Sequence, residues 1–282
     1  MELPFNTPLL LALRLSDEPE LEEGETNPLK LECAPIDDLM NLETYVVKFY
    51  TEVALNGFGI VSELIASHLA KHFGISTPDF ALIEISDAFA KSAMGNMHTS
   101  SHILTRINQN KHSMNFGSKF IGGNTQTPLA MQNPTYTGLS KAENIFAFDA
   151  LIYNADRTNE TPNMFETKDS LIVFDHEKAF HFLFHNPMLI GPEEFGFPGQ
   201  NGGTFLSSHI FRNLLHGRGL AFDNFVDMLQ NLNDTIIDAI MGQIPYDLAK
   251  VHKSQIEAMR NYLMMARNNY REFRFALMRV LA

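Results

Sequence analysis

The stretch FDALIYNADRT, residues 148–158, changes from an apolar segment to a polar loop within a few residues. A capping box over residues 140–143 predicts that a helix begins just before it. This helix is apolar on most sides, so we expect it to be buried. It leads into a loop that contains Asp156 and Asn163, and a β-branched strand then ends at Asp175.

Two carboxylates and an amide in this order are typical of phosphoryl transfer, where catalysis depends mainly on positioning and charge neutralisation. Asp156 is the candidate catalytic base, because one carboxylate must orient the attacking hydroxyl. Asp175 and Asn163 are the candidate magnesium ligands, since hard cations prefer oxygen ligands. Thr161 remains the alternative to Asn163 in that role.

A strand and a helix nearer the N-terminus supply a second set of residues. Residues 45–50, YVVKFY, predict a strand with Lys48 in its middle. Apolar residues at helical spacing over residues 60–73 predict a helix that carries Glu63 and ends at Gly74. The phosphates of ATP need a cation, and a lysine among apolar neighbours needs an acidic partner. We therefore interpret Lys48 and Glu63 as cofactor-binding residues.

Each of these residues, taken alone, has a simpler interpretation. Lys48 by itself is better explained as an outward residue of an edge strand, and Glu63 as a solvated helix residue. Asp156 and Asp175 by themselves are equally typical of turn caps. Their order along the chain favours a kinase-type site over four independent coincidences.

Composition narrows the class of protein. With 282 residues, 45% of them hydrophobic, the chain can bury the core of one large domain or of two packed lobes. The single cysteine, Cys33, excludes an intramolecular disulfide, and the N-terminal segment lacks the basic region and cleavage site of a signal peptide. We therefore expect a cytoplasmic protein. A formal net charge of -12 argues against direct binding to nucleic acid or to membranes.

Several motifs together are similar to those of one family. They lie between Tyr45 and Phe180 and read YVVKF (45–49), SELIASHLA (62–70), GISTP (74–78), NFGSKF (115–120), FDALIYNADRT (148–158), PN (162–163), FDH (174–176) and AF (179–180). In this set the chain resembles the HipA-like kinases, specifically their short stand-alone type.

The resemblance implies a role for each candidate residue. Lys48 contacts the phosphates of ATP, and Glu63 pairs with it. Asp156 is the catalytic base, while Asn163 and Asp175 bind Mg²⁺. The resemblance also implies a protein substrate, phosphorylated on serine or threonine, and an antitoxin protein as partner in a toxin–antitoxin pair.

We expect an α+β fold with the two lobes of a protein kinase: a small β-rich N-lobe over residues 1–88 and a larger, mainly helical C-lobe over residues 89–282. Residues 103–107, ILTRI, indicate a further short strand. The predicted function is ATP- and magnesium-dependent phosphorylation of a protein hydroxyl. Two alternatives stay open: a pseudokinase that binds nucleotide or a partner without turnover, and a lipid kinase, because the Asp-Arg loop is also similar to that of phosphoinositide kinases.

Overall fold

A computed structural model describes residues 5–21, 27–95, 99–122, 136–167, 170–185 and 204–282. The chain divides into two compact units. The barrel unit comprises Asn6–Leu64 and Pro78–Gly122, and the helical unit comprises Met1–Phe5, Ile65–Thr77 and Gly123–Ala282. The expected α+β class is confirmed, with a β-rich N-terminal region and a helical C-terminal part.

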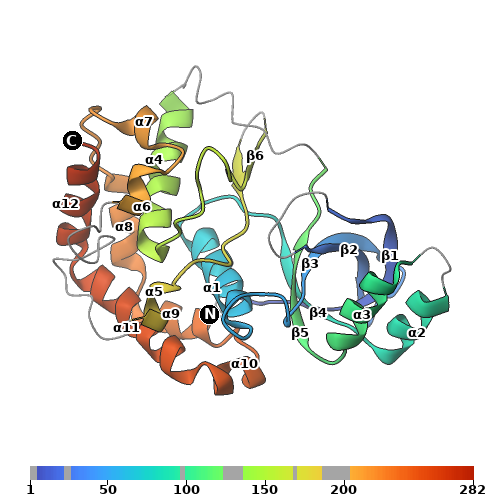
Figure 1. Ribbon diagram of the computed structural model, residues 1–282. Coiled ribbons are helices and arrows are strands. Elements are labelled where there is room, and N and C mark those ends of the chain that lie inside the picture. Colours follow the sequence, from blue (N-terminus) through green and yellow to red (C-terminus); the bar gives the residue numbers. More distant parts are fainter. Residues whose placement is uncertain (1–4, 22–26, 96–98, 123–135, 168–169, 186–203) are drawn as a thin grey trace. The chain divides into compact units, whose positions relative to one another are not determined.

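Five strands form a closed barrel in the first unit (Figure 1). They are β1 (Leu9–Glu20), β2 (Leu29–Pro35), β3 (Glu43–Lys48), β4 (Phe80–Glu84) and β5 (Met114–Lys119). Their order is β1-β2-β3-β5-β4, and a parallel pairing of β1 with β4 closes the barrel, whereas the other neighbours are antiparallel. Closure leaves no exposed edge on β3, so its residues pack against strands on both sides.

Two helices cover part of the barrel: α2 (Asp87–Gly95) and α3 (Ser101–Gln109). Ile103 and Ile107 of α3 join the barrel core. The strand predicted over residues 103–107 is therefore wrong. The hydroxyl of Ser100 accepts a hydrogen bond from the amide of Ile103, and this N-cap favours a helix over the strand that the β-branched residues indicated.

Residues 78–122 belong to the barrel unit although they follow α1 in the chain. The reason lies in strand pairing. β5 pairs with β3 and with β4, so a segment late in the chain completes the sheet.

Helices dominate the second unit. Helix α1 (Phe58–His72) begins in the barrel unit and ends in this one. The remaining elements are α4 (Tyr136–Ile152), β6 (Met164–Glu166), β7 (Leu171–Val173), α5 (Phe182–His185), α6 (Thr204–Ser207), α7 (Arg212–Leu215), α8 (Asp223–Asn231), α9 (Asp234–Met241), α10 (Tyr246–Val251), α11 (Lys253–Asn268) and α12 (Tyr270–Val280).

Helix α4 carries the segment that opened the sequence analysis and packs against α7 and α8. It begins at Tyr136, so the capping box predicted over residues 140–143 is wrong. Glu143 instead accepts a hydrogen bond from the backbone amide of Phe222, at 2.6 Å. The ring of Phe146 also stacks on the ring of Phe222, so α4 holds Phe222 by both a hydrogen bond and an apolar contact.

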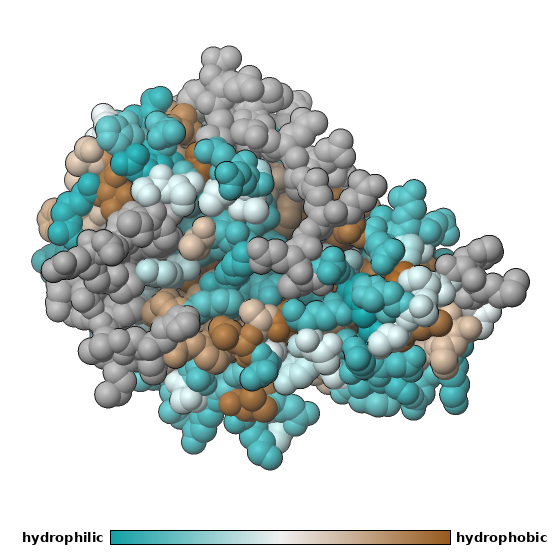
Figure 2. Space-filling model, viewed as in Figure 1, coloured by the Kyte–Doolittle hydropathy of each residue, from teal (hydrophilic) through white to brown (hydrophobic). Residues whose placement is uncertain are grey.

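Aromatic side chains fill the core of the helical unit. The rings of Phe73 and Phe225 stack with their centroids 4.5 Å apart, and the ring centroid of Phe148 lies 6.1 Å from that of Phe73. On the face shown in Figure 2, hydrophilic residues cover most of the described surface and hydrophobic ones form small separate groups. Among the helices that the structure describes, none combines the length and the apolar character needed to cross a bilayer.

Candidate active site

The barrel unit brings together the two residues that the sequence assigns to nucleotide phosphates. Lys48 is the last residue of β3, which lies between β2 and β5. Its Nζ lies 2.7 Å from Oε1 of Glu63 on α1, and both side chains are buried. The predicted ion pair is confirmed, and the edge-strand and solvated-helix alternatives are wrong. A buried lysine beside a buried glutamate keeps its ammonium in one orientation.

The segment after Lys48 is held by side chains to which sequence reasoning assigned no role. Arg106 contacts both carboxylate oxygens of Glu52, at 2.6 and 2.7 Å. The side-chain oxygens of Asn115 and Asn110 accept hydrogen bonds from the backbone amides two and three residues after Lys48, each at 3.0 Å. An asparagine at a buried strand position, such as Asn115, is the sequence signal that points to such a role.

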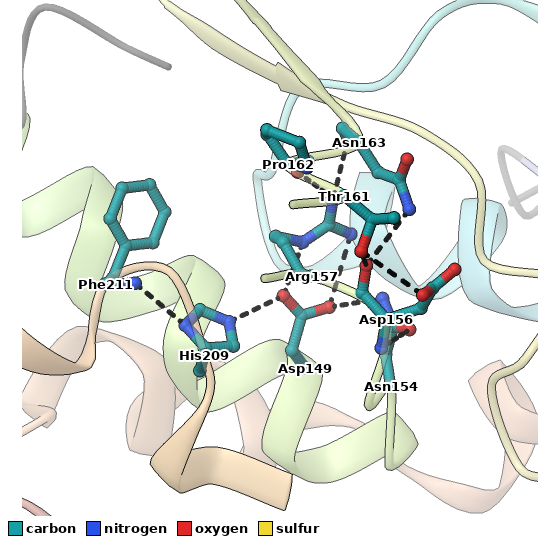
Figure 3. Close-up of polar contacts among 9 residues, drawn as sticks. All are labelled: Asp149, Asn154, Asp156, Arg157, Thr161, Pro162, Asn163, His209 and Phe211. Atoms are coloured by element: carbon teal, nitrogen blue, oxygen red, sulfur yellow. Dashed lines mark hydrogen bonds and ion pairs between the residues drawn. The ribbon is translucent and has the colours of Figure 1, made fainter. Parts of the chain in front are cut away.

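In the helical unit, Asp149 and Arg157 form a fully buried ion pair at the end of α4 (Figure 3). Nε of Arg157 lies 2.6 Å from Oδ2 of Asp149. Another nitrogen of the guanidinium, Nη1, donates to the carbonyl oxygens of Asn163 and Pro162, at 2.6 and 3.3 Å. Arg157 therefore joins the beginning of the loop to its end. We call residues 154–163 the catalytic loop, after the role proposed below.

His209 and Asn154 complete this network around Asp149. Nδ1 of His209 accepts a hydrogen bond from the backbone amide of Phe211, at 3.1 Å, so the proton of the neutral ring is on Nε2. Nε2 lies 3.0 Å from Oδ2 of Asp149 and donates to it. The amide nitrogen of Asn154 donates to Oδ1 of Asp149, also at 3.0 Å. Every oxygen of this buried carboxylate thus has donors, as burial of a charge requires.

Electrostatics favour an ionised aspartate and a neutral histidine in this network. Burial by itself raises the pKa of Asp149, but the charge of Arg157 and the hydrogen bond from His209 outweigh it and hold that pKa below its usual range. Burial lowers the pKa of His209, against the opposing effect of Asp149. The network therefore contains one negative and one positive group, which balance each other.

Asp156 lies on the catalytic loop with its carboxylate only partly buried. Its Oδ2 lies 3.2 Å from Nζ of Lys178, and the hydroxyl of Thr161 lies 3.3 Å from its Oδ1. The turn at this point is made by Asn154, whose Oδ1 accepts from the backbone amide of Asp156. The side chain that caps this turn is therefore that of Asn154. The carboxylate of Asp156 instead contacts the side chains of Lys178 and Thr161.

Asn163 and Asp175 flank the hairpin formed by β6 and β7. Met164 is paired with Val173, and the amide of Phe174 donates to the carbonyl oxygen of Asn163 at 3.0 Å. The hairpin therefore brings Asn163 and Asp175 to the same end. Both have left-handed backbones, with φ of 47° and 59°. Asparagine and aspartate tolerate this conformation better than most residues.

The side chains at this end of the hairpin carry donor atoms of the types that magnesium prefers. Nδ2 of Asn163 donates to the carbonyl oxygen of Asp156, at 3.1 Å, which turns its Oδ1 away from that carbonyl (Figure 3). An amide oxygen and the carboxylate of Asp175 are hard ligands, and Mg²⁺ takes few protein ligands besides water. The hydroxyl of Thr161 is hydrogen-bonded to the carbonyl of Asp156, at 2.8 Å, so Asn163 fits the ligand role better.

Comparison with known proteins shows which family and which solved structure the chain is similar to. A family model described as HipA-like kinase matches residues 20–189. Among solved structures, the chain is similar to a proinflammatory kinase from Helicobacter pylori, CtkA, with 13% sequence identity and a TM-score of 0.54. That alignment covers 96% of this chain and 99% of the other, and at this identity it supports the fold alone. No curated protein sequence matches the chain.

Proposed function

Because the chain belongs to the HipA-like kinase family, we propose that it is an ATP- and magnesium-dependent kinase that phosphorylates serine or threonine in a protein. The proposal includes the two-lobed arrangement of protein kinases, with the barrel unit as the small lobe. The protein acceptor and an antitoxin partner are proposed from the family resemblance.

The observation that carries the proposal is the hairpin end where Asn163 and Asp175 lie beside the loop of Asp156. Asn163 and Asp175 would hold Mg²⁺, which draws charge from the phosphate oxygens when it is bound. Lys48 would bind the phosphates of ATP, and Glu63 keeps its ammonium oriented. The groups needed for phosphoryl transfer are then all assigned.

The chemistry assigned to the chain itself centres on Asp156. Its carboxylate accepts the proton of the acceptor hydroxyl as the oxygen bonds to the γ-phosphorus. The bond from that phosphorus to the β–γ bridging oxygen breaks, and ADP leaves with the electron pair. The buried network of Asp149, Arg157 and His209 fixes the position of the catalytic loop through contacts that do not involve the side chain of Asp156.

The test measures binding and transfer separately. Melting temperature with and without ATP and Mg²⁺ reports binding, and transfer of label from γ-labelled ATP reports turnover. Asp175→Asn should remove most of the magnesium-dependent stabilisation, whereas Asp227→Asn, at an exposed position on α8, should change nothing.

Three outcomes separate the proposal from its alternatives. Label in protein supports the proposal. Label in phosphoinositide vesicles would replace it with lipid phosphorylation. Binding of nucleotide by an undamaged preparation without any transfer would indicate the pseudokinase instead.

A further inference from the structure

Lys178 lies three residues after Asp175 and contacts the proposed catalytic base. Its Nζ is 3.2 Å from Oδ2 of Asp156, and the exposed fractions of the two side chains are 40% and 22%. Both groups can therefore be reached from solvent. Sequence reasoning gave Lys178 no role.

The backbone fixes the position of Lys178 relative to Asp156. The amide of Ala179 donates to the carbonyl of His176, at 2.9 Å, which closes a tight turn around Lys178. The amide of Phe180 donates to the carbonyl of Ile152, at 2.8 Å, at the last residue of α4. Ala179 and Phe180 are both fully buried. The turn that carries Lys178 is thus fastened to the helix that leads to Asp156.

Arg157 cannot supply the same positive charge to a ligand. It follows Asp156 directly, but its side chain is fully buried. Its guanidinium is hydrogen-bonded to Asp149 and to two carbonyl oxygens of the loop. In contrast, the side chain of Lys178 is 40% exposed, and its ammonium contacts Asp156 directly.

We propose that Lys178 binds the γ-phosphoryl group of ATP, next to Asp156. This inference rests on the proposed function. In the transition state, negative charge is spread over the equatorial oxygens of the phosphoryl group and over the attacking and leaving oxygens, and a cation held beside this group stabilises that charge. A mobile lysine suits this task, since it can leave one oxygen for another without losing its charge.

The proton and electron balance of transfer is unchanged by this role. The hydroxyl proton goes to Asp156, the acceptor oxygen bonds to the γ-phosphorus, and the electron pair of the broken bond leaves on ADP. Lys178 stays protonated throughout. Its N–H groups move from the carboxylate of Asp156 to a non-bridging oxygen of the phosphoryl group.

The competing explanation is an ordinary surface salt bridge, which contributes little to any function. Lys111 provides the matched control, because its Nζ lies 2.9 Å from Oδ1 of Asp87, and both of these groups are also partly exposed. The experiment compares wild type, Lys178→Met, Lys178→Arg and Lys111→Met. For each, calorimetric titration gives the affinities for ATP and for ADP in the presence of Mg²⁺, and melting temperature verifies folding.

If Lys178 binds the γ-phosphoryl group, Lys178→Met should weaken ATP binding by about 10-fold while ADP affinity stays the same, as expected for loss of one charge-assisted hydrogen bond. Its kcat should fall by about 10²-fold. Lys178→Arg should retain part of both, and Lys111→Met should match wild type. An unchanged ratio of ATP to ADP affinity in folded Lys178→Met would overturn the inference and leave the proposed function standing. Wild type that binds neither nucleotide would instead refute the proposed function, and the role of Lys178 with it.

Discussion

Replacing Arg157 by methionine tests whether the buried network determines the stability of the catalytic loop. The substitution leaves the carboxylate of Asp149 buried and ionised without its cation, which typically costs about 3–5 kcal/mol. The carbonyl oxygens of Pro162 and Asn163 also lose their hydrogen bonds from Arg157, and each loss costs about 1 kcal/mol of stability. Because the free energy of unfolding of a domain is only about 5–15 kcal/mol, Arg157→Met should lose a large share of the total stability.

The double variant Asp149→Asn/Arg157→Met should recover part of that loss. It contains neither charge, and the single amide oxygen of Asn at position 149 can still accept from one of the two donors, His209 or Asn154, which bond to different oxygens of Asp149. We expect the two substitutions to be coupled by about 2 kcal/mol or more. Urea denaturation at pH 7 gives the free energies of unfolding, and constant slopes would show that the unfolded reference is unchanged.

The pair Asp238 and Arg260 is the control. Its Nε–Oδ1 distance is also 2.6 Å, but the two side chains are 35% and 55% exposed. Exposed pairs typically contribute less than about 1 kcal/mol, so Arg260→Met should have a small effect. If Arg157→Met cost no more than Arg260→Met, or if the effects at positions 149 and 157 simply added, burial would not be what makes this network strong.

Three further predictions concern the base, the loop after Lys48 and acid stability. Asp156→Asn should keep the melting temperature and nucleotide binding but lower phosphoryl transfer by about 10²- to 10⁴-fold, and unchanged transfer would exclude Asp156 as the base. Gly57→Ala should lower the free energy of unfolding by about 1–3 kcal/mol, because Gly57 has a φ of 87° and an added Cβ would lie 2.1 Å from Cε2 of Tyr50; a neutral result in urea denaturation would contradict this. Burial lowers the pKa of His68 from 6.5 to about 4, so the unfolded chain binds its proton first, and stability should be lost as the pH falls from 6.5 towards 4; a His68→Gln variant should show a flatter pH profile, and an equally steep one would assign the loss to other groups.

The parts of the site that could be predicted are those encoded by local patterns. The β-branched run around Lys48 and the helical spacing around Glu63 correspond to β3 and α1. The left-handed Gly74, with a φ of 64°, ends that helix as expected. The pairing could be predicted because a lysine among apolar neighbours needs an acidic partner, and the glutamate of the following helix supplies it.

The parts that could not be predicted depend on contacts between distant positions. His209 meets Asp149 across 60 residues, and nothing in the sequence around either residue indicates the other. Asp149 is the one polar position in the apolar second half of α4, residues 145–152, and this is the local sign of a buried partner. β5 was missed as part of the barrel for the same reason, since its partners β3 and β4 lie far away in the chain.

Local patterns also misled where two of them competed. Residues 103–107 contain β-branched side chains, but Ser100 and the apolar positions Ile103 and Ile107, four residues apart, favour the helix that forms. The capping box at residues 140–143 has the expected letters, yet the helix extends one turn further towards the N-terminus and Glu143 serves another segment. A four-residue capping motif is therefore weak evidence for where a helix begins.

Four residues without the freedom of glycine have left-handed backbones around the proposed site: Tyr153, Asn163, Asp175 and Phe180, with φ between 47° and 61°. Each such residue costs of the order of 1–3 kcal/mol unless its side chain hydrogen-bonds locally. Glycine would relieve that cost at Asn163 and Asp175, but it would remove the two side chains proposed to bind Mg²⁺. Selection for thermal stability alone would favour glycine at these two positions, whereas the proposed function accounts for asparagine and aspartate there at a cost in stability.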